Sequence, residues 1–309
     1  MTLSALKIHG IIPPLVTPLS DRDELDRAGL ERLVEHLVGA GVHGLFVLGT
    51  TGEGPSLSRK VRREMVEQTC GLARGRLPVY VGITDTSLVE ARHLAWQSVE
   101  AGAAAVVAAP PFYFPAGQTE LRHWFDELLA DLPLPLLAYN IPSCTKIAIE
   151  RETLEALIEK ENVVGLKDSS GDLDVPSDAL ALAAEKRPGW PVLTGPEHLL
   201  AEAVALGASG GVTGGANLAP RFFVDLYEAA RAGNAAEVAR LQALVTRLRE
   251  LYTIGKYGSA FLKGVKCALE RSGVCSGRMA PPFDAFHAPE RERVARWMAG
   301  FAETGYLPG

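Results

Sequence analysis

The feature that most constrains the fold is an alternation of short apolar runs with helical patterns, repeated eight times over about the first 230 residues. Apolar runs without polar alternation are typical of strands that are buried on both faces. The expected strands cover residues 10–16, 43–48, 77–83, 104–109, 135–138, 163–166, 191–193 and 210–212. The expected helices that follow them cover residues 26–40, 58–74, 87–101, 119–130, 150–159, 175–186, 197–206 and 220–232.

Strands that alternate with helices of this length predict parallel pairing through helical crossovers. Eight such units fit a closed (β/α)8 TIM barrel, whose typical size is about 250 residues. An open doubly wound sheet is the alternative, but it would carry a glycine fingerprint after the first strand, and IPPLVTP at 12–18 is not one.

From residue 233 onward the pattern is helical only, over 235–252, 259–272 and 289–301. No Gly/Ser-rich linker or charge run separates this part from the strand–helix units. We therefore expect a barrel at residues 1–232 and a C-terminal helical region at 233–309 that docks on it.

Composition and charge exclude several classes of function. The net charge of −6 gives no basic footprint for nucleic acid, and no apolar run reaches the roughly 18 residues that cross a bilayer. The N-terminus lacks the apolar core of a secretory signal. The four cysteines are scattered, which predicts free thiols in a cytoplasmic protein. The histidines are dispersed as well, so neither a metal nor another cofactor is expected.

The segment VVGLKDSS at 163–170 places a lysine at the end of a buried strand. Burial of Lys167 would lower its pKa, and the neutral amine could attack a carbonyl to form a Schiff base. The alternative is that Lys167 simply pairs with Asp168 at the strand end.

Reactive side chains gather at the ends of several other expected strands. Barrel enzymes place their active sites at the C-terminal ends of the strands, so this clustering indicates a site. The residues at these ends are Thr17, Thr50, Thr51, Thr84, Asp85, Tyr113, Tyr139, Asn140, Lys167, Thr194, Thr213, Gly214 and Gly215.

Two of these strand ends suggest specific roles. The loop GTTGEG at 49–54 is either a tight turn or a cradle of backbone N–H groups and hydroxyls for a carboxylate. Tyr139 ends the strand next to that of Lys167, so its phenol could exchange protons with a substrate there. The alternative for Tyr139 is a packed ring with a satisfied hydroxyl.

The glycine-rich segment after the eighth strand has two interpretations. It could bind phosphate, as loops after strands seven and eight of barrels often do. No helix-start signature with a lysine accompanies it, which favours a segment that gives room to a substrate chain. We therefore expect Gly211, Val212 and Thr213 to contact the substrate.

Three motifs occur in a characteristic order: GTTGE at 49–53, YNIP at 139–142 and GLKDS at 165–169. With them the chain resembles the dihydrodipicolinate synthase/N-acetylneuraminate lyase family of class I, Schiff-base, pyruvate-type aldolases. The similarity runs from about residue 10 to the C-terminal helices. It implies a TIM barrel with a helical C-terminal part, a small-molecule 2-oxo acid substrate, and a homotetramer built as a dimer of dimers.

The resemblance also implies roles for individual residues. Lys167 forms the imine, Tyr139 is the acid/base, and Thr50 and Thr51 hold the 2-oxo acid carboxylate. Tyr113 is similar to the tyrosine that a dimer partner contributes to the proton relay in the synthase branch.

One position departs from the synthase branch, which carries an arginine two residues beyond YNxP, in a segment like YNVPSRT. Cys144 stands there, and a thiol cannot make the bidentate carboxylate contact of arginine. The resemblance is therefore closer to the branch that cleaves or condenses 2-keto-3-deoxy acids. The alternatives are a dihydrodipicolinate synthase, a dehydratase that uses the same imine, and a barrel that binds 2-oxo acids without turnover.

Overall fold

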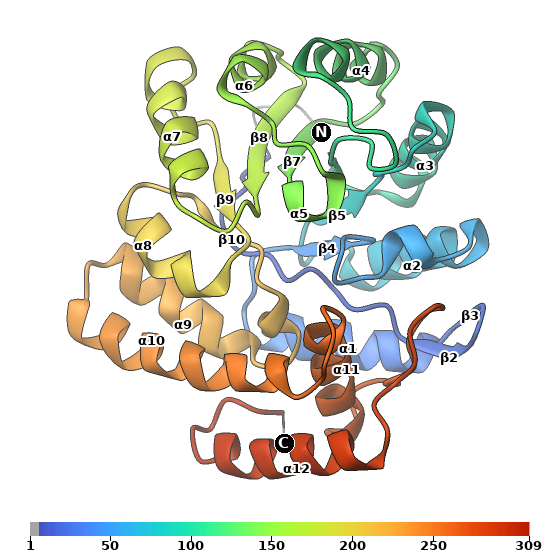
Figure 1. The fold of residues 1–309 in the computed structure, drawn as a ribbon, viewed down its shortest axis with the longest axis vertical. Helices are drawn as coiled ribbons and strands as arrows, with labels where there is room; N and C mark the ends of the chain where they lie inside the picture. The colour runs from blue at the N-terminus through green and yellow to red at the C-terminus, as the bar shows by residue number, and fades with distance from the viewer. Residues whose placement is uncertain (1–5, 309) are drawn as a thin grey trace.

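The computed structural model describes residues 6–308 and is a (β/α)8 TIM barrel (Figure 1), which confirms the predicted fold class. The parallel strands pair in the order β1-β10-β9-β8-β7-β6-β5-β4. A parallel bridge from Pro14 to Phe46 of β4 closes the ring. The strands are β1 Gly10–Ile11, β4 Leu45–Val47, β5 Val79–Gly82, β6 Ala105–Ala108, β7 Leu136–Asn140, β8 Val163–Asp168, β9 Val192–Thr194 and β10 Gly210–Gly211.

Helices surround the strands, and each turns its apolar side toward them. Ser58 and Ser87 cap α2 and α3, because their hydroxyls accept a backbone N–H of the first turn. The barrel helices are α1 Arg27–Gly39, α2 Arg59–Ala73, α3 Leu88–Ala101, α4 Gln118–Ala130, α6 Arg151–Ile158, α7 Asp174–Lys186, α8 Leu200–Ala205 and α9 Pro220–Arg231. Short 3-10 turns are η2 Gly54–Ser56, η3 Glu197–Leu199, η4 Gly214–Asn217 and η5 Leu251–Thr253.

The structure differs locally from the expected elements. The first strand ends at Ile11, because Pro13 and Pro14 have no N–H to donate to a neighbouring strand. A small antiparallel hairpin, β2 Leu19–Asp21 and β3 Glu24–Leu25, was not predicted, and neither was the one-turn helix α5 Pro142–Thr145.

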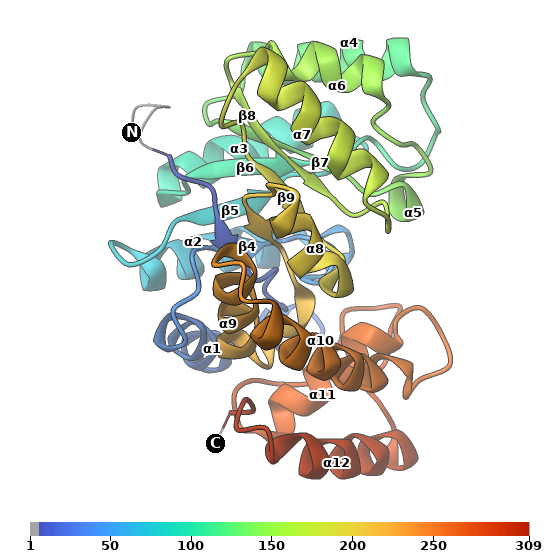
Figure 2. The same ribbon diagram turned by 90° about the vertical axis from the view of Figure 1, so that its left-hand side faces the viewer.

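Three further helices, α10 Ala235–Glu250, α11 Ala260–Arg271 and α12 Ala288–Ala302, follow the barrel units and occupy the lower part of Figure 1. The turned view in Figure 2 shows α12 lying beyond α10 and α11, at the end of the molecule opposite α4 and α6. Buried side chains of all three helices, including Leu241, Val265 and Val294, belong to the same apolar cluster as the barrel helices. The division at residue 232 stays a prediction.

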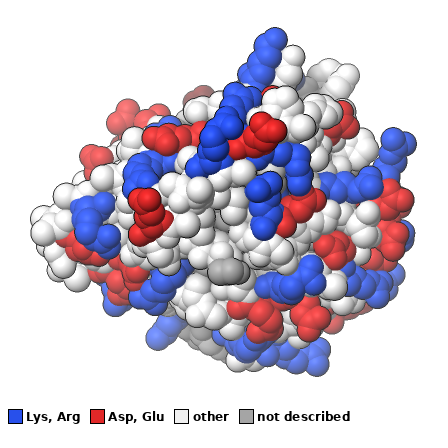
Figure 3. All heavy atoms as spheres, turned by 90° about the horizontal axis from the view of Figure 1, so that it is seen from below, with Lys and Arg blue, Asp and Glu red and all other residues white. Residues whose placement is uncertain are grey.

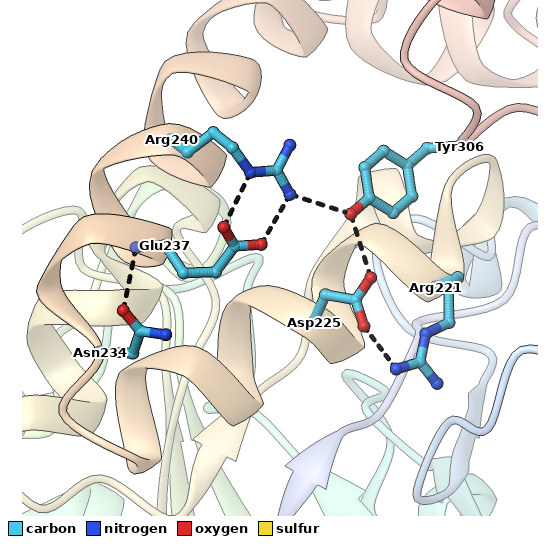
Figure 4. A network of polar contacts seen from close by, with 6 residues as sticks. All are labelled: Arg221, Asp225, Asn234, Glu237, Arg240 and Tyr306. Carbon is cyan, nitrogen blue, oxygen red and sulfur yellow. Dashed lines mark hydrogen bonds and ion pairs between the residues drawn. The ribbon is translucent and has the colours of Figure 1, made fainter.

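A polar network fastens the C-terminal segment to the barrel (Figure 4). The Tyr306 hydroxyl donates to Asp225 of α9 at 3.0 Å, and Arg240 of α10 donates to the same hydroxyl at 3.4 Å. The Tyr306 ring packs edge-on against Phe222 with 5.3 Å between the centroids. The segment after α12 thereby joins α9 to α10.

On the face shown in Figure 3, basic and acidic side chains are interspersed, and neither sign forms a continuous patch. Within residues 6–308, no helix is both long and apolar enough to cross a membrane.

Candidate active site

Lys167 lies inside the barrel, near the C-terminal end of β8. Its side chain is 3% exposed, and its neighbour in register on β7 is Tyr139. The Lys167 Nζ lies 3.3 Å from the centroid of the Tyr139 ring and donates to Ser169 Oγ at 3.0 Å. The amine therefore contacts an aromatic face and one hydroxyl.

Asp168 is not the ion-pair partner of this amine. Its carboxylate accepts the Asn140 side-chain amide at 2.7 Å and the Ser170 hydroxyl at 2.7 Å. Successive side chains of a strand point to opposite faces, which separates the two groups. Burial lowers the pKa of Lys167 well below its usual range, although the charge of Asp168 opposes this shift. The geometry thus favours a neutral amine over the alternative of a strand-end ion pair.

The phenol of Tyr139 lies between Lys167 and the loop after β4. Its hydroxyl is 3.4 Å from Thr50 Oγ1. Burial raises the pKa of Tyr139 to about 12, and contacts with the hydroxyls of Thr50 and Ser169 lower it only in part. Tyr139 is therefore a neutral phenol in the free protein and needs a nearby positive charge to give up its proton.

A cavity of about 310 Å³ connects most of the predicted site residues, and we call it the Lys167 cavity. This volume is at the lower end of the range for small-molecule sites. The predicted residues that line it are Lys167, Tyr139, Thr50, Thr51 and Val212. Gly211 and Thr213 flank Val212 and are buried, but they do not line the cavity.

Tyr113 is placed elsewhere, on the loop between β6 and α4. Its side chain is 70% exposed, that of Phe114 is 78% exposed, and the two rings pack edge to face. A second cavity of about 230 Å³, the apolar cavity, adjoins the site and shares Thr50 and Tyr139 with the Lys167 cavity. Phe112 and Phe283 also line the apolar cavity.

Cys144 is exposed on α5 and lines the apolar cavity. Among the described residues, no lysine or arginine lines that cavity. The position that the resemblance assigns to a carboxylate-binding arginine therefore offers no positive charge here.

The loop after β4 is held in place by a buried ion pair. Lys266 of α11 donates to Glu53 Oε1 at 2.7 Å and to the Thr17 carbonyl at 2.8 Å, and the Ala280 N–H donates to Glu53 Oε2 at 2.7 Å. The side chains of Glu53 and Lys266 are 2% and 0% exposed. Glu53 adopts φ 57°, a left-handed conformation that these contacts stabilise. Its role is to order the loop that carries Thr50 and Thr51.

Lys266→Met is expected to reduce the free energy of unfolding by about 3–5 kcal/mol, because it leaves the carboxylate of Glu53 buried without its counter-charge. Urea unfolding measures this loss. Lys263→Met on the same helix serves as the control and should change stability by no more than about 0.5 kcal/mol. A loss below about 1 kcal/mol for Lys266→Met would contradict the role given to the pair.

Several residues of the site carry no clear signal in the sequence. Ser169, which contacts Lys167, reads as part of a polar turn, and a side chain on Gly195 would collide with its hydroxyl. Glu197 is buried and accepts the Gly215 N–H and the Tyr252 hydroxyl, the latter at 2.8 Å. Glu197, Gly215 and Tyr252 meet only through the fold, so a one-dimensional pattern does not reveal their contacts, whereas Ser169 belongs to the GLKDS motif.

Side chains that could bind a metal ion do not gather in this site. Within the part of the chain that the structure describes, no group of three or more His, Cys, Asp or Glu residues has suitable geometry.

A family model described as the dihydrodipicolinate synthetase family matches residues 7–299 of the chain. The chain belongs to this family. It is therefore a class I lyase or aldolase, and the family resemblance predicted from the three motifs is confirmed.

The relatives carry more than one name. The solved structure of a dihydrodipicolinate synthase from Bacteroides thetaiotaomicron is 48% identical, with a TM-score of 0.92 over 94% of this chain and 98% of that one. A prophage protein of Escherichia coli K12, solved with pyruvate, is 25% identical, with a TM-score of 0.90 over 96% and 99%. A probable 2-dehydro-3-deoxy-D-pentonate aldolase of Escherichia coli is 30% identical over 80% of this chain and 83% of its own length.

Proposed function

We propose that the protein forms an imine between Lys167 and a 2-oxo acid, and that it cleaves a 2-keto-3-deoxy acid or makes one from pyruvate and an aldehyde. The observation that carries this proposal is the buried amine of Lys167, 3.3 Å from the Tyr139 ring and without a carboxylate partner among residues 6–308. The family, the pyruvate complex of one relative and the pentonate aldolase name of another support the same chemistry.

The reaction begins when the Lys167 nitrogen attacks C2 of the substrate. The C2 oxygen then leaves as water with one proton from the Tyr139 phenol, directly or through water, which gives a protonated imine beside a phenolate. This cation withdraws electrons from C3, so the bond between C3 and C4 breaks and its electron pair forms an enamine. The proton of the C4 hydroxyl passes to Tyr139, and an aldehyde departs. The enamine then takes up a proton at C3, and hydrolysis releases pyruvate from Lys167.

The environment of Tyr139 fits this sequence of steps. In the free protein, burial keeps its phenol protonated. A positive imine beside the ring would stabilise the phenolate, because an opposite charge at a few ångströms favours the ionised form. Tyr139 would thus become a competent base only after the substrate has bound covalently.

The loop of Thr50 and Thr51 would bind the substrate carboxylate. Both residues line the Lys167 cavity, on the loop that Glu53 and Lys266 hold in place. Their hydroxyls and backbone N–H groups can bind an anion through charge-assisted hydrogen bonds. Val212, flanked by Gly211 and Thr213, would contact the remainder of the chain.

Dihydrodipicolinate synthesis from pyruvate and aspartate semialdehyde is the second candidate, favoured by the 48% identical relative of that name. Against it stands Cys144 at the position of the arginine of that branch, since a thiol cannot form the bidentate contact of arginine with the carboxylate of the aldehyde. A dehydratase or a non-catalytic 2-oxo acid barrel has no comparable observation in its favour.

Turnover of a substrate panel tests the proposal. The panel contains 2-keto-3-deoxy sugar acids, N-acetylneuraminate, and pyruvate with aspartate semialdehyde. We expect pyruvate and an aldehyde from at least one 2-keto-3-deoxy acid, with turnover well above that of aspartate semialdehyde. Efficient synthesis from aspartate semialdehyde, or release of a deoxy-oxo acid without pyruvate, would overturn this choice of reaction.

We also propose that the protein acts as a homotetramer of tight dimers, in which Tyr113 of one subunit completes the site of its partner. The exposed rings of Tyr113 and Phe114 and the adjoining apolar cavity support this arrangement. A measurement of molecular mass in solution tests it, and a monomer with full activity would contradict it.

A further inference from the structure

The Lys167 cavity contains a guanidinium group, on a helix outside the barrel. Arg249 lies in the last turn of α10 and lines this cavity. Among residues 6–308, Lys167 and Arg249 are the basic side chains that line it. Because the Lys167 amine is neutral in the free protein, the C-terminal helical region supplies the positive charge of the cavity.

The guanidinium of Arg249 is free to bind a ligand. Arg249 is exposed, and no carboxylate of the described part of the chain lies within ion-pair distance of it. The neighbouring Arg247 is different, because it donates to the Gly300 carbonyl at 3.0 Å and packs over the Phe301 ring. The two arginines are close in sequence, but only Arg249 faces the cavity.

Glu197, the acidic residue that lines the Lys167 cavity, already forms hydrogen bonds with other groups. Glu197 accepts the backbone N–H of Gly215 and the hydroxyl of Tyr252. Burial also raises the pKa of Glu197, which disfavours the charge that would attract the guanidinium. The charge of Arg249 also lowers the pKa of His198 and opposes the rise in the pKa of Tyr252 that burial causes. Neither side chain supplies a negative charge at neutral pH.

The wall around Arg249 is shaped by glycines. A side chain on Gly214 would collide with the Phe261 ring, and one on Gly215 would collide with the Tyr252 hydroxyl. Phe261 and Tyr252 pack edge to face, with 4.7 Å between their centroids, and both line the Lys167 cavity. The glycines let these rings approach the end of β10, so the cavity has rigid walls between Lys167 and Arg249.

We infer that Arg249 binds an anionic group at the end of the substrate remote from C2, so that the aldehyde fragment carries a carboxylate or a phosphate. The inference rests on the proposed function, in which Lys167 binds C2 and the loop of Thr50 and Thr51 binds the C1 carboxylate. A planar guanidinium forms two parallel hydrogen bonds to a carboxylate or a phosphate, which selects for such groups.

Substrates that differ only at the far end test the inference. Three 2-keto-3-deoxy acids of equal chain length would end in a carboxylate, a phosphate or a hydroxymethyl group. The kcat/KM of Arg249→Met is expected to fall about 10- to 100-fold for one anionic substrate, the size of a hydrogen bond to a charged group, and to stay unchanged for the neutral one. The anionic substrate whose kcat/KM falls identifies the group that Arg249 binds. Arg249→Lys should recover part of the loss.

Arg247→Met is the matched control, because it removes a positive charge from the same helical turn without touching the cavity. An equal fall of kcat/KM for all three substrates would show that Arg249 binds the C1 carboxylate that they share. An unchanged kcat/KM for both anionic substrates would show that Arg249 binds no substrate group. Either result overturns the inference. Trapping of pyruvate on Arg249→Met with borohydride is measured in parallel. If parent and variant both fail to trap pyruvate, the proposed imine chemistry is wrong instead.

Discussion

Lys167→Met is expected to abolish turnover, with a loss on the order of 10⁶-fold, the size that follows removal of a covalent nucleophile. The change removes the nitrogen that forms the imine and keeps a flexible side chain of similar length. The direct measurement is mass spectrometry after treatment with pyruvate and borohydride. The parent protein should gain one reduced pyruvate adduct, on the peptide that contains Lys167, and the variant should gain none.

Loss of the fold would not explain this result, because Lys167 is an unfavourable residue for stability. Its pKa is lowered by burial, so below the usual pKa of lysine the folded protein binds this proton less tightly than the unfolded chain does. The resulting cost to the folded state fades as the pH rises toward about 10.4, the usual pKa of lysine. Lys167→Met removes this cost and should be at least as stable as the parent at pH 7. An adduct on a different lysine would refute the assignment of the nucleophile.

Tyr139→Phe is expected to lower kcat by about 10²- to 10⁴-fold, the usual contribution of a positioned proton-transfer group. The phenyl ring keeps its place beside the amine, so the variant should still form an imine with pyruvate. Borohydride trapping would then be retained while cleavage of the bond between C3 and C4 is slow. Single-turnover kinetics separates the two steps.

Tyr80→Phe provides the matched control. Tyr80 lies on β5, its hydroxyl is buried without a hydrogen-bond partner within the described residues, and it lines neither cavity of the site. Removal of this hydroxyl should leave kcat unchanged and stability equal or higher. Equal kinetic losses in the two variants would assign the effect of Tyr139 to packing, and full activity of Tyr139→Phe would exclude it as the acid/base.

The architecture and the centre of the site could be predicted because each depends on local sequence. Buried parallel strands are apolar throughout, and the residues that end them point into the mouth of the barrel, so Lys167 and Tyr139 could be placed together. The hairpin of β2 and β3 and the single turn of α5 escaped prediction, because segments of two to four polar or mixed residues have no measurable period.

The remainder of the site depends on contacts between distant parts of the chain. Lys266 reads as one more basic residue on a helix, and its burial against Glu53 becomes visible only when α11 is in place. Arg249 resembles Arg247 in sequence, and the orientation of α10 alone decides which of them faces the cavity. The burial of Lys266 and the orientation of Arg249 toward the cavity both arise only when the helices pack.

The ion pair of Glu53 and Lys266 also has a consequence for synthesis of the protein on the ribosome. Its partners are 213 residues apart, and Ala280, which completes the bonds to Glu53, lies 227 residues beyond it. When all eight strands of the nascent chain have emerged from the ribosome, Lys266, the counter-ion of Glu53 in the loop of Thr50 and Thr51, has not yet been available to pair with it. The site can therefore gain its final shape only near the end of translation, and the half-made barrel needs protection until then.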